Sequence, residues 1–359
     1  MKLKSFLQIF GGIAIVLTLL PFIAIDYWWI RVFDFPHFQL TVLTFIALLT
    51  YFIRFDINQK NDYIFVGVIL ACFLFQLSKI YPYTPFANYE VLESSQNEQV
   101  SSFSIFTANV LQKNDKKDKL LAATESNKAD ILLFTETDEK WLNNILPAVK
   151  NDYTYKSEYP LDNTYGMLLY SKFPLINPQV KFMVEDSIPS IHSLFTLPSG
   201  DTIQLYAIHP TPPMPQHNPS SSDRDAEMMK IALLSMHSKY PVLVLGDFND
   251  VAWSESTNNF QEISGLLDPR KGRAFYNTFN AKNILMRWPL DHIFISEHFR
   301  LIEKKRGKAI DSDHFPIFAK LSFEPDGASM QKKAPPSQEQ IKTAREQIQA
   351  EKEADSEGG

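Results

Sequence analysis

Carboxylate, amide and imidazole side chains recur in this sequence beside short runs of β-branched and aromatic residues. They are Asn109, Glu136, His209, Asp247, Asn249, Asp291, Asp313 and His314. Carboxylates hold hard cations such as Mg²⁺, neutral amides orient a phosphate or a water molecule, and imidazoles polarise or protonate. Together these groups are what the metal-assisted hydrolysis of a phosphoester requires.

Each of these positions also has an ordinary structural explanation. A glutamate after a strand can cap the next helix, and Gly246-Asp247-Phe248-Asn249 taken alone is typical of a turn. A single histidine is usually a surface or core residue. The repetition of the same residue types at comparable strand ends instead favours a shared cleft at the edge of a sheet.

Short strands, with fewer helices, would position these side chains. The sequence predicts strands over 103–107, 131–135, 167–170, 203–208, 242–245, 290–295 and 317–323. It predicts helices over 116–126, 139–149 and 223–238, and the methionine-rich face of the last favours core packing. Because strands outnumber helices and do not alternate strictly with them, we expect an α+β fold with two packed, mostly antiparallel sheets flanked by helices.

The order of the polar motifs resembles that of a known family. The motifs of the endonuclease/exonuclease/phosphatase family match, in order, Thr107-Ala108-Asn109-Val110, Leu133-Phe134-Thr135-Glu136, His209-Pro210, Gly246-Asp247-Phe248-Asn249, Leu290-Asp291-His292-Ile293 and Ser312-Asp313-His314-Phe315-Pro316. The resemblance covers nearly all of residues 101–323, and the ordered set is more specific than any one motif. It implies a four-layer α/β sandwich.

The resemblance also implies a metal site. Glu136 would be the main ligand of Mg²⁺, or of Mn²⁺, with Asn109 and Asp313 nearby. Oxygen donors of this kind suit a hard divalent cation.

The same resemblance implies a set of catalytic residues. Asp247 would orient or deprotonate the attacking water, and Asn249 would bind a phosphate oxygen. His314 would pair with Asp291 at the scissile phosphate, and His209 would contact the phosphate or assist the leaving group. A histidine at position 209 matches the deoxyribonuclease and sphingomyelinase branches rather than the abasic-site endonucleases. The general base is unsettled within the family and is left open here.

A proline-rich run follows His209 and departs from the family pattern. Residues 210–215 are stiff and extended in character, so they can form one wall of the cleft. Arg224 stands at the start of the following helix, where it can reach a substrate phosphate. An ordinary surface loop with an arginine near the helix cap is the alternative.

The N-terminal region has a different composition from the rest. Residues 1–84 contain apolar segments at about 5–25, 35–53 and 63–81, each suited in length to a transmembrane helix. A cleaved signal peptide and buried soluble helices are the alternatives, but no small-residue cleavage site precedes Asp26. The mean hydropathy of −0.16 therefore averages a membrane module with a soluble part.

Flanking basic residues predict the orientation of these helices. The N-terminal end and the loop between the second and third segments carry Lys2, Lys4, Arg54 and Lys60, against Arg31 and Lys79 on the other side. Because Lys and Arg are retained in the cytoplasm, we expect an inner or plasma membrane protein with a cytoplasmic N-terminus and an extracytoplasmic catalytic domain. The single cysteine, Cys72, excludes an internal disulfide.

The remaining segments complete the domain organisation. Residues 85–100 are polar and read as a linker, residues 101–323 as the catalytic domain, and residues 324–359 as a disordered polar tail with possible helix at 338–353.

Three functions are compatible with the sequence. The first is a membrane-anchored, metal-dependent phosphodiester hydrolase, nuclease-like in its substrate. The second is a phospholipid or sphingolipid phosphodiesterase or phosphatase of the same fold, and the third is a catalytically inactive, membrane-tethered binding domain. Nucleic acid would require basic patches, for which the candidates are Arg270-Lys271 with Arg273 and the stretch 300–308. The net charge of −6 argues against a generally basic surface.

Overall fold

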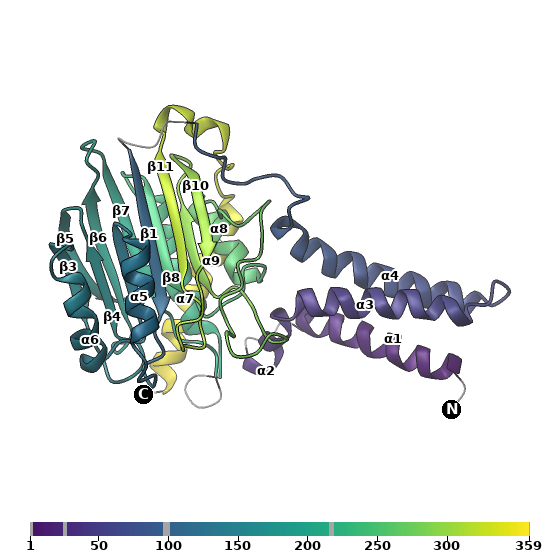
Figure 1. Ribbon diagram of the computed structural model, residues 1–359. Helices are drawn as coiled ribbons and strands as arrows, with labels where there is room; N and C mark the ends of the chain where they lie inside the picture. Colours follow the sequence, from purple (N-terminus) through teal and green to yellow (C-terminus); the bar gives the residue numbers. More distant parts are fainter. Residues whose placement is uncertain (1–2, 24–26, 96–100, 215–218, 359) are drawn as a thin grey trace.

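The computed structural model describes residues 3–23, 27–95, 101–214 and 219–358. Lys2, residues 24–25 of the first expected span and residues 96–100 of the expected linker lie outside the described residues. The chain has two visibly different parts, which we call the sandwich (residues 101–323) and the arm (residues 3–83) (Figure 1).

Two sheets form the inner layers of the sandwich. In the described residues, a six-stranded sheet has the order β10 (Phe299–Arg306), β11 (Ile317–Phe323), β1 (Ser102–Asn109), β2 (Ile131–Thr135), β4 (Met167–Ser171), β3 (Tyr155–Tyr159). A five-stranded sheet has the order β5 (Leu175–Phe182), β6 (Pro189–Thr196), β7 (Thr202–Ile208), β8 (Val242–Asp247), β9 (Asp291–Ile295). The pairs β1–β2 and β7–β8 are parallel, and the other neighbours printed in these orders are antiparallel.

Strand alternation fills both faces of each sheet. In β2, Ile131 and Leu133 face the core between the sheets, whereas Leu132 and Phe134 pack on the other side. That outer face is covered by α5 (Asp118–Asn127) and α6 (Glu139–Val149), and α7 (Ser222–Met236) and α8 (Glu255–Ser264) cover the second sheet. The expected four-layer sandwich is confirmed.

The strands that the sequence did not predict are mainly edge strands. β3, β5 and β10 each end a sheet within the described residues, and the outer side of β10 makes only an isolated bridge, between Leu301 and Glu93. β10 ends in Glu303-Lys304-Lys305-Arg306, and such charges are common on edges because they discourage pairing with another chain. Charged residues also weaken the alternation by which a strand is recognised. The stretch 300–308, which the sequence analysis considered as a basic patch, thus lies mostly on edge strand β10.

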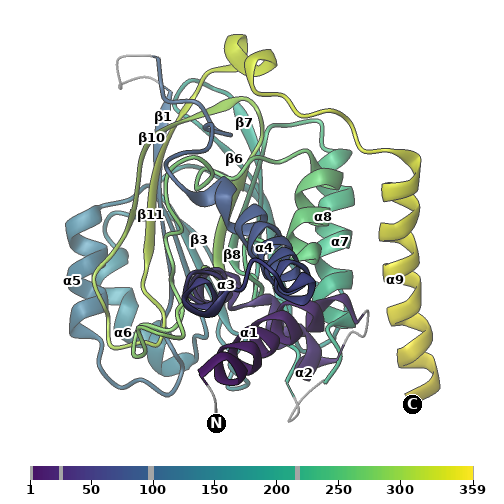
Figure 2. The ribbon, with the colours of Figure 1, turned by 90° about the vertical axis from the view of Figure 1, so that its right-hand side faces the viewer.

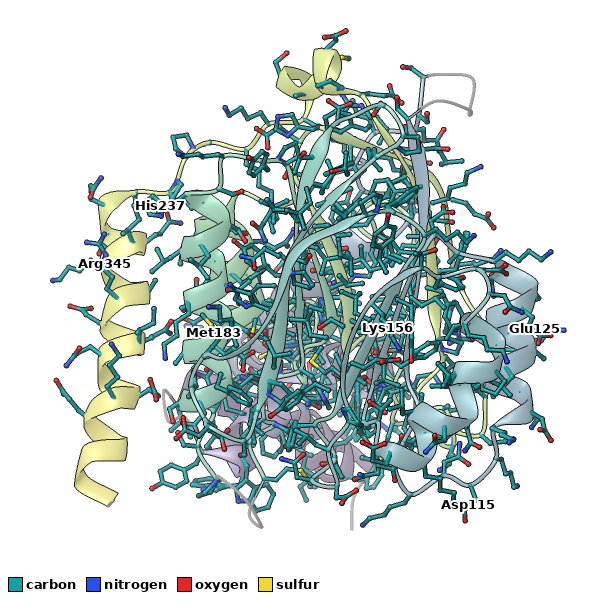
Figure 3. All side chains as sticks on the ribbon, turned by 90° about the vertical axis from the view of Figure 1, so that its left-hand side faces the viewer. Asp115, Glu125, Lys156, Met183, His237 and Arg345 are labelled. Atoms are coloured by element: carbon teal, nitrogen blue, oxygen red, sulfur yellow. The ribbon has the colours of Figure 1, made fainter. Side chains whose placement is uncertain are left out.

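The C-terminal segment contains a helix where the sequence analysis allowed one, at residues 338–353. It forms η5 (Pro325–Met330) and α9 (Gln338–Gly358), and α9 lies against α7 and α8 on the flank opposite α5, as the labelled Arg345 and Glu125 show (Figure 3). Ala344 is buried in the cluster beneath α7, and Lys230 on α7 lies 3.4 Å from Glu351. The segment has too few apolar residues to fold alone, but its few suffice against an existing apolar surface.

The arm consists of three long helices that point away from the sandwich (Figure 1). They are α1 (Leu3–Leu19), α3 (His37–Tyr51) and α4 (Lys60–Ile80), extended by η1 (Leu20–Phe22), η3 (Phe52–Arg54) and η4 (Tyr81–Tyr83). Each extended helix is long and apolar enough to cross a membrane. Between the first two lie α2 (Trp28–Arg31) and η2 (Val32–Asp34), at the junction with the sandwich.

Apolar packing and hydrogen bonds join the arm to the sandwich. Figure 2 looks along the arm and shows its helices in front of the sandwich. Tyr83 at the end of the arm is buried with Trp253 and Trp288 of the sandwich. The Trp253 Nε1 donates to the Asp34 carbonyl at 2.9 Å, and the Trp28 backbone N–H donates to the Pro219 carbonyl at 2.7 Å. The expected linker is also attached, because the Ser94 and Leu301 backbone N–H groups bond across to Leu301 and Leu92.

Candidate active site

The polar residues singled out in the sequence meet at one end of the sandwich. The parallel pair β1–β2 places Asn109 opposite Thr135, directly before Glu136, and the antiparallel pair β8–β9 places Asp247 opposite Asp291. Strands from both sheets therefore deliver their terminal side chains to one place. The shared cleft expected from strand ends is found in the structure.

Asn109 bridges the two sheets at the base of the site. Its Nδ2 donates to Glu136 Oε1 at 2.7 Å and to Asp247 Oδ2 at 2.9 Å, and its Oδ1 accepts from the Leu111 N–H at 2.9 Å. The side chain is fully buried and its hydrogen bonds are satisfied on both ends of the amide. This arrangement fixes two carboxylates on either side of a neutral amide.

His314 lies between two carboxylates. Its Nδ1 donates to Asp291 Oδ2 at 2.8 Å, and its Nε2 lies 3.5 Å from Asp247 Oδ2. Burial by itself disfavours the charged ring, but the charges of Asp247 and Asp291 outweigh it and raise the pKa of His314 to about 10. The ring is therefore an oriented imidazolium at neutral pH.

Glu136 is a buried carboxyl group whose negative charge the protein only partly compensates when it is ionised. Burial raises its pKa to about 7, against the hydrogen bond from Asn109, which lowers it. Burial likewise raises the pKa of Asp247. Closely spaced carboxylates with raised pKa values are what a site built for a cation shows when it is described without one.

The donor set therefore fits a divalent metal ion. Glu136 and Asp313 both line the cavity described below, and each offers carboxylate oxygens. In the described residues, Asp247, Asp291 and His314 also offer ligand atoms within 4.8 Å of one another. The His314 Nδ1 in this second group is already engaged by Asp291, so Glu136 with Asp313 is the more open of the two sets.

His209 is buried beside Asp247 but remains neutral. Its Nε2 lies 3.9 Å from Asp247 Oδ2, its Nδ1 has no hydrogen-bond partner, and Tyr165 packs on the ring at 5.1 Å between centroids. Burial lowers the pKa of His209 to about 4, and the nearby Asp247 only partly offsets this. A neutral, unpartnered imidazole at the cavity wall can donate a hydrogen bond to a ligand.

Two site residues have a left-handed backbone. The φ angles are 59° at Glu136 and 51° at Asn249, in a region that non-glycine residues rarely adopt. Asn249 is held there by a hydrogen bond from its N–H to Asp247 Oδ1 at 3.0 Å and by one from its Nδ2 to the Pro210 carbonyl at 2.9 Å. Strained backbone of this kind is concentrated at functional sites.

Arg224 does not lie where the sequence analysis expected. Its guanidinium is buried behind the cavity, donates to Asp225 Oδ1 at 2.9 Å, and lies 3.4 Å from Asp250. It also donates to the Asn249 carbonyl at 3.2 Å. Arg224 therefore supports the Asn249 turn from behind, and this placement is not that of a direct substrate contact. A position at the start of a helix does not show which way the side chain points, and here it points to Asp225 and Asp250.

Gly246 is the one residue of the Gly246–Asn249 turn that must lack a side chain. Its φ is +142°, and a Cβ there would lie 1.9 Å from the Ile208 carbonyl oxygen of the paired strand. We expect Gly246→Ala to lower the free energy of unfolding by about 3 kcal/mol and to displace Asp247. Gly265 is the matched control, because it also has positive φ but open space around it, so Gly265→Ala should cost only about 1 kcal/mol. Thermal unfolding of the full chain in detergent measures both, and equal shifts would show that the clash is absent.

A cavity of about 440 Å³ opens over these residues. Glu136, His209, Asn249, Asp313 and His314 line it, as do Pro212 and Pro213 of the proline-rich run. The wall predicted for that run is thus present. Sequence reasoning missed further lining residues, namely Trp28, Arg31, Val32 and Phe35 of the arm and Lys113, Tyr165 and Phe279 of the sandwich. The aromatic residues at 27–29 are the sequence signal that could have indicated this wall.

Comparison with protein families decides the identity of the fold. The profile of the Endonuclease/Exonuclease/phosphatase family matches residues 106–314, which span all the site residues described above. The chain belongs to this family. Its members generally hydrolyse phosphoester bonds and generally depend on divalent metal ions. A comparison with curated proteins finds no match.

Solved structures confirm the family fold at low sequence identity. Zebrafish (D. rerio) TDP2 complexed with a single-strand DNA product has 16% identity and a TM-score of 0.52, with 62% of this chain and 99% of that chain covered. An endonuclease/exonuclease/phosphatase family protein from Bacteroides thetaiotaomicron has 16% identity and a TM-score of 0.50, with 63% and 99% covered. A protein of the same description from Beutenbergia cavernae has 13% identity and a TM-score of 0.50, with 62% and 72% covered.

Proposed function

We propose that this family member is a membrane-anchored, divalent-metal-dependent phosphoester hydrolase. The observation that carries the proposal is the bridge from Glu136 through Asn109 to Asp247, with His314 held beside it. Glu136 and His314 line the cavity, and Asn109 and Asp247 are buried next to them. An inactive binding domain would have no need to bury several carboxylates at the cost of their desolvation. The intact set therefore favours catalysis over binding alone.

The residues divide into metal-holding and reacting groups. Glu136, with Asn109 and Asp313 nearby, would hold Mg²⁺, or Mn²⁺, which supplies charge stabilisation to the phosphate. Asp247 lies beside them, buried and fixed by Asn109, where it can orient the attacking water and accept its proton.

Three further residues close to Asp247 would hold the phosphate and the leaving group. Asn249 and His209 both line the cavity, where each can donate to a phosphate oxygen. The His314 imidazolium, fixed by Asp291, offers a proton and a positive charge to the scissile phosphate.

Removal of metal tests the proposal directly. Full-length protein in detergent is expected to hydrolyse bis-p-nitrophenyl phosphate with Mg²⁺ or Mn²⁺ and to lose this activity in EDTA. Isothermal titration with Mg²⁺ gives a second readout, namely one site whose heat disappears in Glu136→Gln. Turnover that persists in EDTA, or no turnover with either metal, would contradict the proposal.

The membrane orientation is a further part of the proposal. The ends of α1 and α4 that carry Lys4 and Lys60 lie at the tip of the arm, away from the sandwich (Figure 1). If basic residues stay in the cytoplasm, the sandwich lies outside it.

Cysteine labelling tests this orientation. In a Cys72→Ser background, a membrane-impermeant maleimide applied to bacterial spheroplasts should label Ser199→Cys in the sandwich. It should not label Asn58→Cys, which lies between α3 and α4 at the tip of the arm; both positions are exposed. The reverse labelling pattern would place the sandwich in the cytoplasm.

Most of the first basic cluster, and Arg300 of the second, give little support to a nucleic-acid substrate. Arg270 is buried and paired with Asp268 at 2.7 Å, and Lys271 pairs with Glu90 at 3.1 Å. Arg300 is buried and donates to backbone carbonyls, including that of Phe299. These three side chains are committed to internal contacts rather than to a surface that tracks a phosphate backbone, whereas Lys305, Arg306 and Lys308 of the second cluster are exposed. The nuclease-like substrate stays a prediction from the sequence.

A further inference from the structure

The arm contributes one wall of the cavity that holds the site residues. Trp28, Val32 and Phe35, with Arg31, line the same cavity as Glu136 and His314. Trp28 is 37% exposed and Val32 is 45% exposed, so these apolar side chains are not simply core. A surface of this kind, a few residues from two membrane-suited helices, lies where an apolar ligand could contact it.

An aromatic path connects this wall with the catalytic histidine. Phe279 packs on His314 with ring centroids 5.0 Å apart and stacks on Trp288 at 6.5 Å. Trp288 in turn meets Phe35 of the arm edge-on at 5.4 Å. The cavity is thus polar at its base and apolar toward the arm. Such division matches a ligand with a charged group at one end and a hydrocarbon chain at the other.

An exposed apolar loop lies beside the start of α3. Ile284, Leu285 and Met286 are 77%, 76% and 53% exposed, and the Leu285 carbonyl accepts from Gln39 Nε2 at the start of α3. Consecutive exposed residues of this type are costly in water and favourable at a bilayer surface. The loop sits beside the first turn of a helix that is long and apolar enough to cross a membrane, and Phe35, just before that helix, lines the cavity.

We propose that the substrate is an amphiphilic phosphoester, a lipid whose phosphate enters from the bilayer. Its hydrocarbon chain would lie along Trp28, Val32 and Phe35, while its phosphate reaches Asn249 and His209. Water oxygen forms a bond to phosphorus, the P–O bond to one alcohol breaks, and that alcohol leaves with a proton, so a diester gives a monoester and an alcohol. This inference rests on the proposed function and adds its substrate class.

Two probes that differ only in chain length test the inference. They are p-nitrophenyl hexadecyl phosphate and p-nitrophenyl ethyl phosphate, assayed with the full chain and Mg²⁺ in one detergent, with a single-stranded oligonucleotide as a third substrate. The measured quantity is the ratio of kcat/KM for the hexadecyl probe to that for the ethyl probe. Partition of the hexadecyl probe into micelles also raises this ratio. The test is therefore the change in the ratio between wild type and variants, which partition does not affect.

The decisive variant is Val32→Asn, with Ile176→Asn as its matched control. Both side chains are β-branched and 45% exposed, but Ile176 lies on edge strand β5, far from the cavity. The ratio should fall about tenfold in Val32→Asn, as expected when an apolar contact with one or two methylene groups is lost. The ratio should stay at the wild-type value in Ile176→Asn. It should also stay close to the wild-type value in Val32→Leu, which keeps an apolar side chain at this position. Melting temperatures show whether each variant is folded.

The outcomes separate this inference from the proposed function. A ratio that is unchanged in Val32→Asn, or preferential cleavage of the oligonucleotide, would overturn the lipid substrate while leaving the hydrolase in place. Metal-independent turnover, or no turnover of any of the three substrates, would overturn the hydrolase and the lipid substrate together.

Discussion

Glu136→Gln is expected to reduce kcat by about 10³-fold, as the loss of several kcal/mol of charge stabilisation implies. Glutamine keeps the shape of the side chain, and its amide oxygen can still accept the hydrogen bond from Asn109 that is 2.7 Å long in the wild type. The variant therefore removes charge without removing the local structure. It should also require a higher Mg²⁺ concentration for half-maximal rate.

Stability provides the second readout for this variant. Burial raises the pKa of Glu136 to about 7, so the folded state holds a proton that the unfolded chain releases above its ordinary value of 4.5. The contribution to stability is complete below pH 4.5 and is lost as pH rises through 7, in the absence of metal. Glu136→Gln should therefore be at least as stable as the wild type at pH 8 in EDTA, which distinguishes lost catalysis from misfolding.

Glu125→Gln is the matched control, since Glu125 is exposed on α5 at the flank of the sandwich (Figure 3). It should leave both kcat and the Mg²⁺ requirement unchanged. A Glu136→Gln variant with more than a tenth of wild-type activity and an unchanged Mg²⁺ requirement would move the metal to the group of Asp247, Asp291 and His314. That result would redirect mutagenesis to Asp247→Asn.

The strands and site residues that could be predicted are those that depend on the pattern of neighbouring residues along the chain. Most central strands could be recognised because both of their faces are buried, as for residues 131–135, and such strands are continuous apolar runs. The exception is β6, a central strand in which every second side chain from His192 to Thr196 is only partly buried, and which was not predicted. The site residues could be located because each follows or opens such a strand. Edge strands such as β10 were missed because one side of each is solvent-exposed and charged.

The parts that could not be predicted depend on long-range packing. Arg224 and Asn249 are 25 residues apart, and only the fold shows that the arginine meets the asparagine carbonyl from behind. The contribution of Trp28 and Val32 to the cavity depends on how the arm is attached to the sandwich, which involves residues such as Asp34 and Trp253 that are 219 positions apart. Local composition places these residues only between two apolar segments, because it contains no information on docking.

His314→Ala is expected to lower kcat by about 10²–10⁴-fold, the usual effect of removing a positioned acid or base. Asp291 acts on the reaction through this ring, to which it is bonded at 2.8 Å, so Asp291→Asn should cost less. Once the ring is gone, Asp291 has nothing to position. The double variant should thus be no slower than His314→Ala, whereas independent contributions would multiply. His237→Ala at the exposed end of α7 is the control and should have wild-type activity.

The pH profile tests why the two residues are coupled. The charges of Asp247 and Asp291 together hold the pKa of His314 at about 10 against the opposing effect of burial. In Asp291→Asn one of these charges is lost, so the pKa of His314 must fall, and the protonated ring must disappear at lower pH. If the imidazolium is the reacting form, the alkaline limb of kcat moves to lower pH in Asp291→Asn. If the alkaline limb of kcat does not move and the losses of kcat multiply in the double variant, Asp291 contributes separately from His314. A residue that acts only through the ring cannot change the rate without changing the ring.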